Sequence, residues 1–551
     1  MTRPQNLQKL HSETFDILVI GAGASGAGSA LDAALRGHKV ALMDKGDFAS
    51  ETSSKSTKLI HGGVRYLEQA FKNFDFAQLR QVKHGLAERH ILLQNAPHLA
   101  RPLALITPVR SWFEAMYFNI GLKLYGWFAK HDSLPSSSWL SRAETFAAIP
   151  NLHPRMHSAV QYYDGQLDDA RYGLALVQTA AANGVIAANY IQVIDFEIIK
   201  YYDFDKKENY QVVNVKDTLT GNVFSIRAKV ILNCTGTQAD TIRKMANPNA
   251  LPRIRTSKGV HIVLPKSLLS NEAAMLIPKT PDGRLVFVIP FQNHTVIGTT
   301  DDEYFDTNQE PHVLKTEVDY LLNTLAPYVR DCPQASDVRA GFAGLRPLIL
   351  SRSKSSTKQL LRDHEVEVDE TSGLVSLLGG KWTTYRLMAK DAVDVIEKIL
   401  LGKTSDCLTE SRTLVGSEQY DFDLFQNLIK KYSINPESTL HLERNYGSKA
   451  MDILKIIEQN PSLATLIIND YPYLKAEVIY ATRYEMCCTI RDFLARRIRL
   501  EILDWNKTLL AIPVVTELMA NELGWSESEI QAQIDIYKKQ IKDFCKNLGI
   551  N

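Results

Sequence analysis

The feature that most constrains the fold is a glycine-rich turn between a predicted strand and a predicted helix near the N-terminus. Residues 15–20 form a short, apolar, β-branched run that predicts a buried parallel strand. The turn at residues 21–26 follows, and residues 27–36, rich in alanine, predict a helix. Residues 39–43 predict a second strand. Together these segments predict a βαβ unit within about 30 residues, and therefore a parallel α/β sheet.

The glycine spacing of this turn matches the chemistry of a dinucleotide site. Gly21 allows the tight turn, Gly23 lets the backbone approach a pyrophosphate, and Gly26 packs helix against strand. The helix N-terminus offers unpaired N–H groups to the phosphates. Asp44 lies at the tip of the second strand, where a carboxylate accepts hydrogen bonds from a ribose. The motif alone fits NAD or FAD, whereas Asp44 argues against NADP because it would repel the 2′-phosphate.

The rest of the chain predicts a sheet-rich middle and a helical C-terminal part. Gly402 and its Thr/Ser neighbours place a domain boundary near residues 400–412, and a capping box at Ser526 and Glu529 predicts the start of a late helix. Residues 496–499, which are rich in arginine, are expected to face solvent or another subunit. The short β-like runs are residues 212–215, 230–233, 260–264, 285–289 and 295–298.

Composition excludes several classes of protein. A length of 551 residues suggests about three domains. The 63 Lys and Arg residues balance the 62 Asp and Glu residues, so no overall field favours nucleic acid and no nucleic-acid partner is expected. The six cysteines form no C-x-x-C pair, so neither a metal site nor a disulfide framework is predicted. No apolar run reaches the ~18 residues that a transmembrane helix needs.

Hydroxyl and lysine side chains crowd the segment beyond the first βαβ unit. Residues 52–58 read Thr-Ser-Ser-Lys-Ser-Thr-Lys, and His61, Gly62 and Gly63 follow shortly after. A solvated loop is one interpretation. The other is a loop that runs along the cofactor, where hydroxyls bond the pyrophosphate and the paired glycines let the backbone contact a flat ring.

At this segment the chain resembles a known family. Residues 53–68, SSKSTKLIHGGVRYLE, closely resemble the signature of the FAD-dependent glycerol-3-phosphate dehydrogenases, which are membrane-associated, quinone-reducing enzymes of bacteria and mitochondria. The similarity continues in the family order through residues 287–301, 344–348, 377–386 and 483–504. The resemblance implies non-covalently bound FAD. It also implies a Rossmann-like FAD-binding domain of the glutathione-reductase/D-amino-acid-oxidase type, an antiparallel-sheet substrate domain and a C-terminal all-α domain.

The resemblance also implies how the chain divides and which residues meet FAD. The FAD-binding domain is expected to comprise residues 14–107, 160–257 and 337–398, and the substrate-binding, membrane-facing domain residues 108–159 and 258–336. Residues 412–551 are expected to form the helical domain. The expected cofactor residues are Gly21, Gly23, Ser25, Gly26, Asp44, Thr52, Ser53, Lys58, Leu59, Gly62, Gly63, Thr235, Gly236, Gly344, Gly380, Lys381, Trp382 and Thr383.

A phosphomonoester substrate requires cationic donors. Arg suits planar recognition of phosphate, and Lys adds a point charge. The resemblance implies that Arg65, Tyr66 and Lys381 hold the phosphate and that Arg346 lies near the reacting hydroxyl. His61 and His261 are candidate bases because imidazole titrates near neutrality, and Arg346 could instead stabilise the developing alkoxide. These alternatives for the catalytic group stay open.

The implied reaction oxidises sn-glycerol 3-phosphate to dihydroxyacetone phosphate by hydride transfer to FAD, and a membrane quinone then takes the electrons. An oxidase that reduces O₂ to H₂O₂ and an amine or amino-acid oxidase of the same fold are the alternatives. Residues 110–130 are rich in aromatics with basic flanks, which is typical either of a helix at a membrane surface or of a buried helix. We expect a peripheral, monotopic protein on the cytoplasmic face of the inner membrane, and a homodimer is compatible with the sequence.

Overall fold

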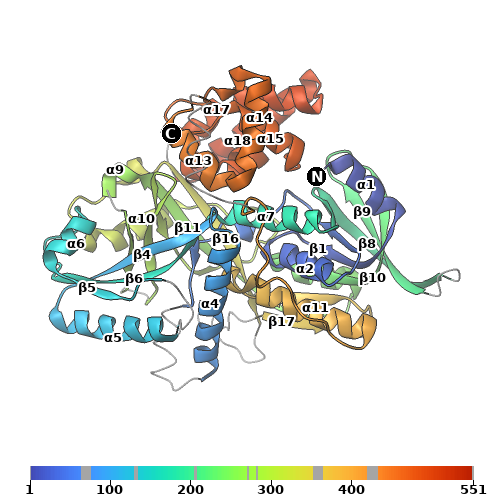
Figure 1. Ribbon diagram of the computed structural model, residues 1–551, viewed down its shortest axis with the longest axis horizontal. Helices are drawn as coiled ribbons and strands as arrows, with labels where there is room; N and C mark the ends of the chain where they lie inside the picture. Colours follow the sequence, from blue (N-terminus) through green and yellow to red (C-terminus); the bar gives the residue numbers. More distant parts are fainter. Residues whose placement is uncertain are drawn as a thin grey trace.

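The computed structural model describes residues 2–63, 76–128, 134–203, 208–269, 272–278, 280, 283–350, 364–418, 432 and 434–548. Two sheets lie side by side, and the C-terminal helices cover one side of the molecule (Figure 1). Arg65 and Tyr66, predicted to bind the substrate phosphate, lie outside the described residues.

The first sheet contains the predicted βαβ unit. Parallel pairing joins β1 to β2 and β10, β2 to β7, and β10 to β18, whereas β8, β9 and β17 attach in antiparallel fashion. Buried apolar residues along β1 explain its central place, because parallel strands are covered on both faces. The strands are β1 (Thr14–Ile20), β2 (Val40–Met43), β7 (Ile186–Ala188), β8 (Ile191–Asp203), β9 (Glu208–Asp217), β10 (Val223–Asn233), β17 (His364–Val368) and β18 (Val375–Gly379).

Helices cover this sheet and position its loops. The helix α2 (Ala24–Leu35) packs against α7 (Asp169–Ala182) and α11 (Tyr385–Leu401), and most of its alanine and glycine residues are buried, which permits this close packing. At the C-terminal end of α11, Gly402 has a φ of +71° and closes the helix. The other helices outside the C-terminal part are α1 (Arg3–Ser12), α4 (Phe76–Asn95), α5 (Trp112–Phe128), α6 (Arg142–Ala148), α8 (Ala239–Ala246), α9 (Lys266–Leu269) and α10 (Lys315–Leu325).

The second sheet is mostly antiparallel. The long strand β11 pairs with β14 and β16, and the register places His261 opposite Gly298 and Phe342, and Ser257 opposite Arg346. Its strands are β3 (Leu59–Ile60), β4 (Ala100–Val109), β5 (Ser138–Leu140), β6 (Ser158–Leu167), β11 (Ile254–Pro265), β12 (Ala274–Ile277), β13 (Val286–Phe291), β14 (His294–Gly298), β15 (Asp302–Glu303) and β16 (Ala340–Ile349).

The C-terminal part is helical, as the sequence predicts. Trp505 and Ile512 share one buried cluster with Val260 and Ile262 of β11, so these helices pack directly on the second sheet. The predicted capping box is present, because Ser526 N donates to Glu529 Oε2 at 2.7 Å and Glu529 N donates to Ser526 Oγ at 3.3 Å. The helices are α13 (Pro436–Tyr446), α14 (Ala450–Gln459), α15 (Lys475–Tyr484), α16 (Leu500–Leu503), α17 (Trp505–Leu523) and α18 (Glu527–Leu548).

The arginine-rich residues 496–499 lie inside the molecule, so the expectation that they face solvent or another subunit is wrong. Arg496 is 7% exposed, and Arg497 and Arg499 are each 1% exposed. Acidic residues from distant segments pair with all three guanidinium groups, which makes their burial tolerable.

Candidate active site

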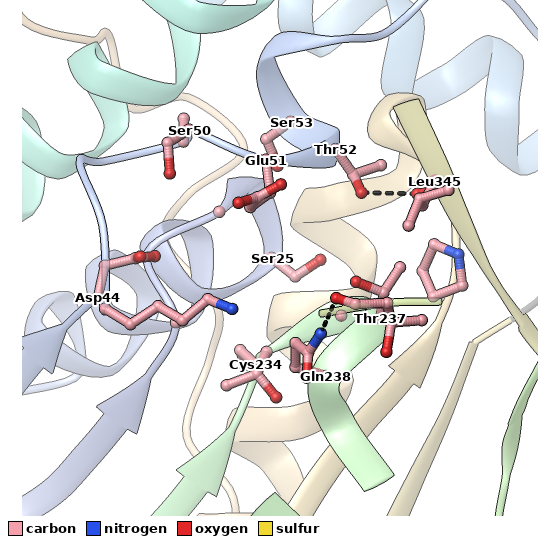
Figure 2. A pocket seen from close by; sticks show the side chains of 18 of the residues that line it. Ser25, Asp44, Ser50, Glu51, Thr52, Ser53, Cys234, Thr237, Gln238 and Leu345 are labelled. Carbon is pink, nitrogen blue, oxygen red and sulfur yellow. Dashed lines mark hydrogen bonds between the residues drawn. The ribbon is translucent and has the colours of Figure 1, made fainter. Parts of the chain in front are cut away.

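A cavity of about 360 Å³ lies where the carboxyl ends of β1, β2 and β10 meet the edge of β16. Figure 2 shows Asp44 and Ser25 on one wall and Leu345 on another. Of the predicted cofactor residues, those that line this cavity are Gly21, Gly23, Ser25, Asp44, Thr52, Ser53, Thr235, Gly236, Gly380, Lys381 and Trp382.

The glycine turn forms a tight cradle at the start of α2. Gly21 has a φ of +98°, and a Cβ atom there would lie 2.7 Å from the Cys234 carbonyl oxygen. A Cβ atom on Gly26 would lie 1.8 Å from the Gly21 carbonyl oxygen, so Gly26 shapes the turn from behind and does not line the cavity. Gly23, the residue before the helix, has no side chain that could cap it, and residues 23–25 line the cavity. The cradle therefore suits the pyrophosphate of a dinucleotide.

Asp44 presents a carboxylate to the same cavity. Its Oδ2 accepts a hydrogen bond from Ala22 N at 2.7 Å, and its Oδ1 accepts one from Gly46 N at 3.0 Å. Burial raises the pKa of Asp44 to about 6, although these two backbone donors favour the charged form. The group is placed at the end of β2, as expected of an acid that accepts ribose hydroxyl groups.

The hydroxyl-rich loop links the cradle to both sheets. In the short helix η1 (Thr52–Ser54), Ser53 Oγ accepts a hydrogen bond from Ala24 N at 3.0 Å. Thr52 Oγ1 donates to Leu345 O of β16 at 2.6 Å, and Trp382 Nε1 donates to Ser53 O at 2.8 Å (Figure 2 shows the Thr52 bond). The first part of the loop therefore lies along the cavity wall.

Some of the predicted cofactor residues lie behind the cavity wall. Lys58 is fully buried, and its Nζ donates to Asp169 Oδ2 at 2.7 Å. Burial lowers the pKa of Lys58 to about 8, although Asp169 favours the charged form. Leu59 is a buried residue of β3. A Cβ atom on Gly344 would lie 2.7 Å from the Lys55 carbonyl oxygen, so this glycine lets β16 approach the loop.

The paired glycines and Thr383 also lie outside the cavity lining. Gly62 N donates to Tyr125 Oη of α5 at 2.7 Å, and Gly63 has a φ of +89°. His61 N donates to Thr383 Oγ1 at 3.3 Å, next to the short helix η5 (Trp382–Thr384). The His61 bond therefore joins this segment to η5, and the Gly62 bond joins it to α5.

Arg346 is fixed by neighbours on β11 and on the segment after β14. Its Nη2 donates to Thr299 Oγ1 at 2.8 Å, and its Nη1 lies 3.3 Å from Asp301 Oδ1. A Cβ atom on Gly259 would lie 2.3 Å from Arg346 Nη2, so the glycine makes room for the guanidinium group. The side chain keeps 21% of its surface exposed. An oriented, partly open guanidinium can bind an anionic or oxygen-rich group.

The two candidate bases differ in their surroundings. His261 is 2% exposed, its Nε2 lies 3.0 Å from Thr57 Oγ1, and its ring stacks on Phe342 with centroids 4.8 Å apart. Burial, with further contributions from the Lys58 and Arg346 charges, lowers the pKa of His261 well below its ordinary value. His261 is therefore neutral at pH 7 and a weak proton acceptor. His61 is partly exposed, and its ring stacks against Phe287 at 6.4 Å.

Sequence reasoning missed the cavity-lining residues of the segment after β15 and of the turn after β10, among them Gln238, Thr307 and Glu310. Gln238 Nε2 donates to Thr307 O across the cavity mouth, and Figure 2 shows Gln238 pointing into this region. Glu310 pairs with Lys55 at 2.7 Å and with Arg491 at 2.8 Å. Burial would raise the pKa of Glu310, but these two cations hold it well below its ordinary value. Residues 304–314 carry no glycine motif or periodicity that would have indicated this role.

The fold and the cavity define a flavin-dependent oxidoreductase. A family model described as "FAD dependent oxidoreductase" matches residues 16–386, and one described as "C-terminal domain of alpha-glycerophosphate oxidase" matches residues 407–530. Within that class, the chain belongs to the FAD-dependent glycerol-3-phosphate dehydrogenase family. The comparisons confirm the predicted family, the predicted fold class and FAD as the cofactor.

Individual relatives match over nearly the whole chain. The "Probable glycerol-3-phosphate dehydrogenase, mitochondrial" of Dictyostelium discoideum is 38% identical, over 98% of this chain and 87% of the relative. The mitochondrial glycerol-3-phosphate dehydrogenase of Mesocricetus auratus is 39% identical, over 97% of this chain and 74% of the relative. A structure of the Bacillus halodurans glycerol-3-phosphate dehydrogenase with FAD superposes with a TM-score of 0.78 at 28% identity, covering 98% of this chain and 97% of that chain.

Proposed function

We propose that this protein is an FAD-dependent glycerol-3-phosphate dehydrogenase that oxidises sn-glycerol 3-phosphate to dihydroxyacetone phosphate and passes the electrons to a membrane quinone. The observation that carries the proposal is one cavity that combines a dinucleotide cradle with Lys381, beside a fixed and partly open Arg346, in a chain of this family.

The residues present fit FAD. The N–H groups at the start of α2 would hold the pyrophosphate, and Asp44 would accept the ribose hydroxyl groups. Ser53 and Trp382, which are joined by a hydrogen bond, would fix the cofactor from the loop side. When bound, FAD supplies the hydride acceptor. The chain binds and orients the substrate and accepts the proton of its hydroxyl group.

On the substrate side, we assign the phosphate to Lys381 together with Arg65 and Tyr66. Arg346 then orients the C2 hydroxyl and stabilises the alkoxide that develops as the proton leaves. A role for His261 as the base is disfavoured by its burial, its low pKa and its bond to Thr57. His61, which is partly exposed, is the better proton acceptor of the two histidines.

The helix α5 is the proposed contact with the membrane. No helix within the described ranges is long and apolar enough to span a bilayer. The outward face of α5 nevertheless exposes large apolar side chains, while its inward Tyr125 is 2% exposed and bonds Gly62. The most exposed of them are Trp112 (50%), Phe113 (73%), Tyr117 (52%), Ile120 (54%) and Trp127 (61%). Such a face is typical of a helix that lies in a membrane interface and supports a peripheral membrane contact, whereas the cytoplasmic face of the inner membrane is proposed from the family resemblance.

The contact between Tyr125 and Gly62 also suggests the side from which a quinone approaches. In Figure 1 α5 lies on the side away from the C-terminal helices, below the second sheet. Its inner face reaches the His61–Gly63 segment, which in one interpretation of the sequence lies against the flavin ring. A quinone dissolved in the membrane would therefore approach from the side on which α5 lies.

Replacing Phe113 and Trp127 by serine should abolish co-flotation with vesicles of anionic phospholipid while leaving reduction of a soluble quinone analogue intact. Unchanged flotation would contradict the assignment of α5 as the membrane contact.

The visible spectrum of the purified protein tests the activity. We expect a flavin spectrum that bleaches when glycerol 3-phosphate is added without oxygen, and colour returning on addition of a quinone analogue. A protein whose flavin stays oxidised in the presence of this substrate is not a glycerol-3-phosphate dehydrogenase.

A second candidate is a glycerol-3-phosphate oxidase, which the match of residues 407–530 to the C-terminal domain of alpha-glycerophosphate oxidase favours. The two activities differ in the electron acceptor. Near-stoichiometric H₂O₂ in air, with little reduction of the quinone analogue, would identify the oxidase.

A further inference from the structure

The buried arginines of residues 496–499, the arginine turn, connect the C-terminal helices to the loops that line the cofactor cavity. The turn comprises the last two residues of a short π-helical segment, η9 (Asp492–Arg497), and the two residues before α16. Arg499 adopts a left-handed backbone conformation with a φ of +70°, which is unusual for a residue other than glycine. Such a conformation persists only where the surrounding contacts over-determine it.

The first contact is with the hydroxyl-rich loop. Arg499 Nη2 donates to Ser54 O at 2.8 Å, and Lys58 Nζ donates to the same carbonyl oxygen at 2.9 Å. Ser54 ends η1, whose other two residues, Thr52 and Ser53, line the cavity. Two buried cations therefore hold one backbone carbonyl directly behind the cavity wall.

Asp169 completes this arrangement. Its Oδ1 accepts from Arg499 Nη2 at 2.8 Å and from Lys58 Nζ at 2.8 Å. Its Oδ2 accepts from both the backbone N–H and the hydroxyl of Ser56, at 2.8 and 2.7 Å. Lys58 and Asp169 are 0% exposed. A buried carboxylate with this many charge-assisted bonds holds residues 54–58 in one conformation.

The second contact is with the loop after β2. Arg496 Nε lies 2.5 Å from Asp47 Oδ2, and Arg497 Nη1 lies 2.7 Å from the same oxygen. Asp47 is 1% exposed and belongs to the loop whose residues Asp44 and Ser50 line the cavity. The arginine turn thus holds both loops that flank the dinucleotide cradle.

We propose that Arg499 is a positioning residue for the flavin: through Ser54 and Asp169 it fixes the cofactor-side loop, so that the C-terminal helices set the geometry of the reaction. The expected change in the rate of flavin reduction rests on the proposed function. The expected change in the flavin spectrum requires only that FAD is bound. Lys58, expected from the sequence to meet the cofactor, acts in this arrangement from behind the loop.

Arg499→Lys in the holoenzyme is the test, and Arg171→Lys is the matched control. Arg171 also joins α7 to the C-terminal helical part from a buried position, through bonds of 2.8 Å to both Glu485 oxygens. Its remaining guanidinium bond runs to Asn445 O. Glu485 also pairs with Arg497 at 3.2 Å, so the control perturbs the neighbouring charges but leaves the bonds from Arg499 to Ser54 and Asp169 in place. Lysine keeps the charge at either position but replaces the rigid guanidinium plane and its five donors by one ammonium group on a flexible stem, so it does not hold its acceptors in the same geometry.

We expect Arg499→Lys to alter the visible circular dichroism of bound FAD and to slow anaerobic flavin reduction by glycerol 3-phosphate about tenfold or more, with a KM change below about twofold. Arg171→Lys should leave the dichroism and the reduction rate at wild-type values, even where its melting temperature falls equally. Wild-type dichroism and rate in Arg499→Lys would overturn the proposal, as would equal changes in both variants.

A milder variant covers the case in which Arg499→Lys does not fold. Ser56→Ala removes one bond to Asp169 and the bond from Lys58 N to Ser56 Oγ at 3.0 Å. It should shift the flavin dichroism measurably, and an unchanged spectrum would refute the positioning role. If the wild-type flavin is not reduced by glycerol 3-phosphate, the proposed function fails, while the dichroism of the three variants still decides this inference.

Discussion

Gly259→Ala should displace the Arg346 guanidinium while leaving the glycine-rich cofactor cradle at residues 21–26 unchanged. An alanine Cβ atom at this position would lie 2.3 Å from Arg346 Nη2 and 2.7 Å from Thr299 Oγ1. Both contacts involve side-chain atoms, and the guanidinium lies at the end of a flexible side chain. The backbone of β11 can therefore keep its place while the guanidinium moves away.

The expected effect on the rate follows from the role of Arg346. A hydrogen bond to a charged group contributes about 1.5–3 kcal/mol, and each 1.4 kcal/mol corresponds to a factor of ten in rate. Displacing Arg346 should therefore slow flavin reduction by about 10- to 150-fold. The free energy of unfolding should fall by about 1–3 kcal/mol, because the substitution removes the bonds from Arg346 to Thr299 and to the Thr300 carbonyl oxygen and breaks its partly exposed pair with Asp301.

Anaerobic stopped-flow measurement of flavin reduction by glycerol 3-phosphate is the assay, with the flavin content and the melting temperature measured on the same preparation. Gly121→Ala is the control, because a Cβ atom there meets nothing within 4 Å and alanine is the better helix former. A Gly259→Ala enzyme that reduces its flavin at the wild-type rate would refute the assignment of Arg346, and loss of flavin with a normal rate in the remaining holoenzyme would do the same.

Two further measurements test the cofactor side of the cavity. Because burial raises the pKa of Asp44 to about 6, above its usual value near 4, the free energy of unfolding of the apoprotein should fall as the pH rises from about 4 to 6. Asp44→Asn should remove this dependence, worth at most about 3 kcal/mol, as followed by urea unfolding at several pH values; parallel pH profiles would contradict it. Trp382→Phe removes the bond to Ser53 O and should weaken FAD binding about 3- to 10-fold in equilibrium titration, and unchanged affinity would show that the bond does not hold the loop.

The cofactor half of the site could be predicted from the sequence because its signals are local. Gly21, Gly26 and Asp44 belong to one βαβ unit, and the parallel pairing of β1 with β2 brings them together at one edge. The helix boundaries near Gly402 and Ser526 follow from capping rules that need only a few residues.

The buried charges could not be predicted in this way. Ser54 and Arg499 are 445 residues apart in the sequence, and nothing local distinguishes a buried arginine from a solvated one. A run of arginines such as residues 496–499 ordinarily faces water. Here Asp47 and Asp169, which are distant in the sequence, form ion pairs with it inside the molecule. His261 is a similar case, since its sequence position suggested a base and its burial against Phe342 makes it neutral.

The two halves of the site rely on different physical interactions, and this explains where substitutions should act. The cradle is built from backbone groups and glycines, so side-chain changes nearby alter FAD binding mainly through Asp44 and the Ser53 loop. The substrate side is built from charged side chains that other charged side chains hold in place, as Asp301 holds Arg346. Because removing Asp301 would leave the Arg346 guanidinium without the partner that orients it, substitutions on that side should change rates by large factors while leaving flavin content intact. A set of substrate-side variants that lost flavin in proportion to activity would show that the two halves are not separable in this way.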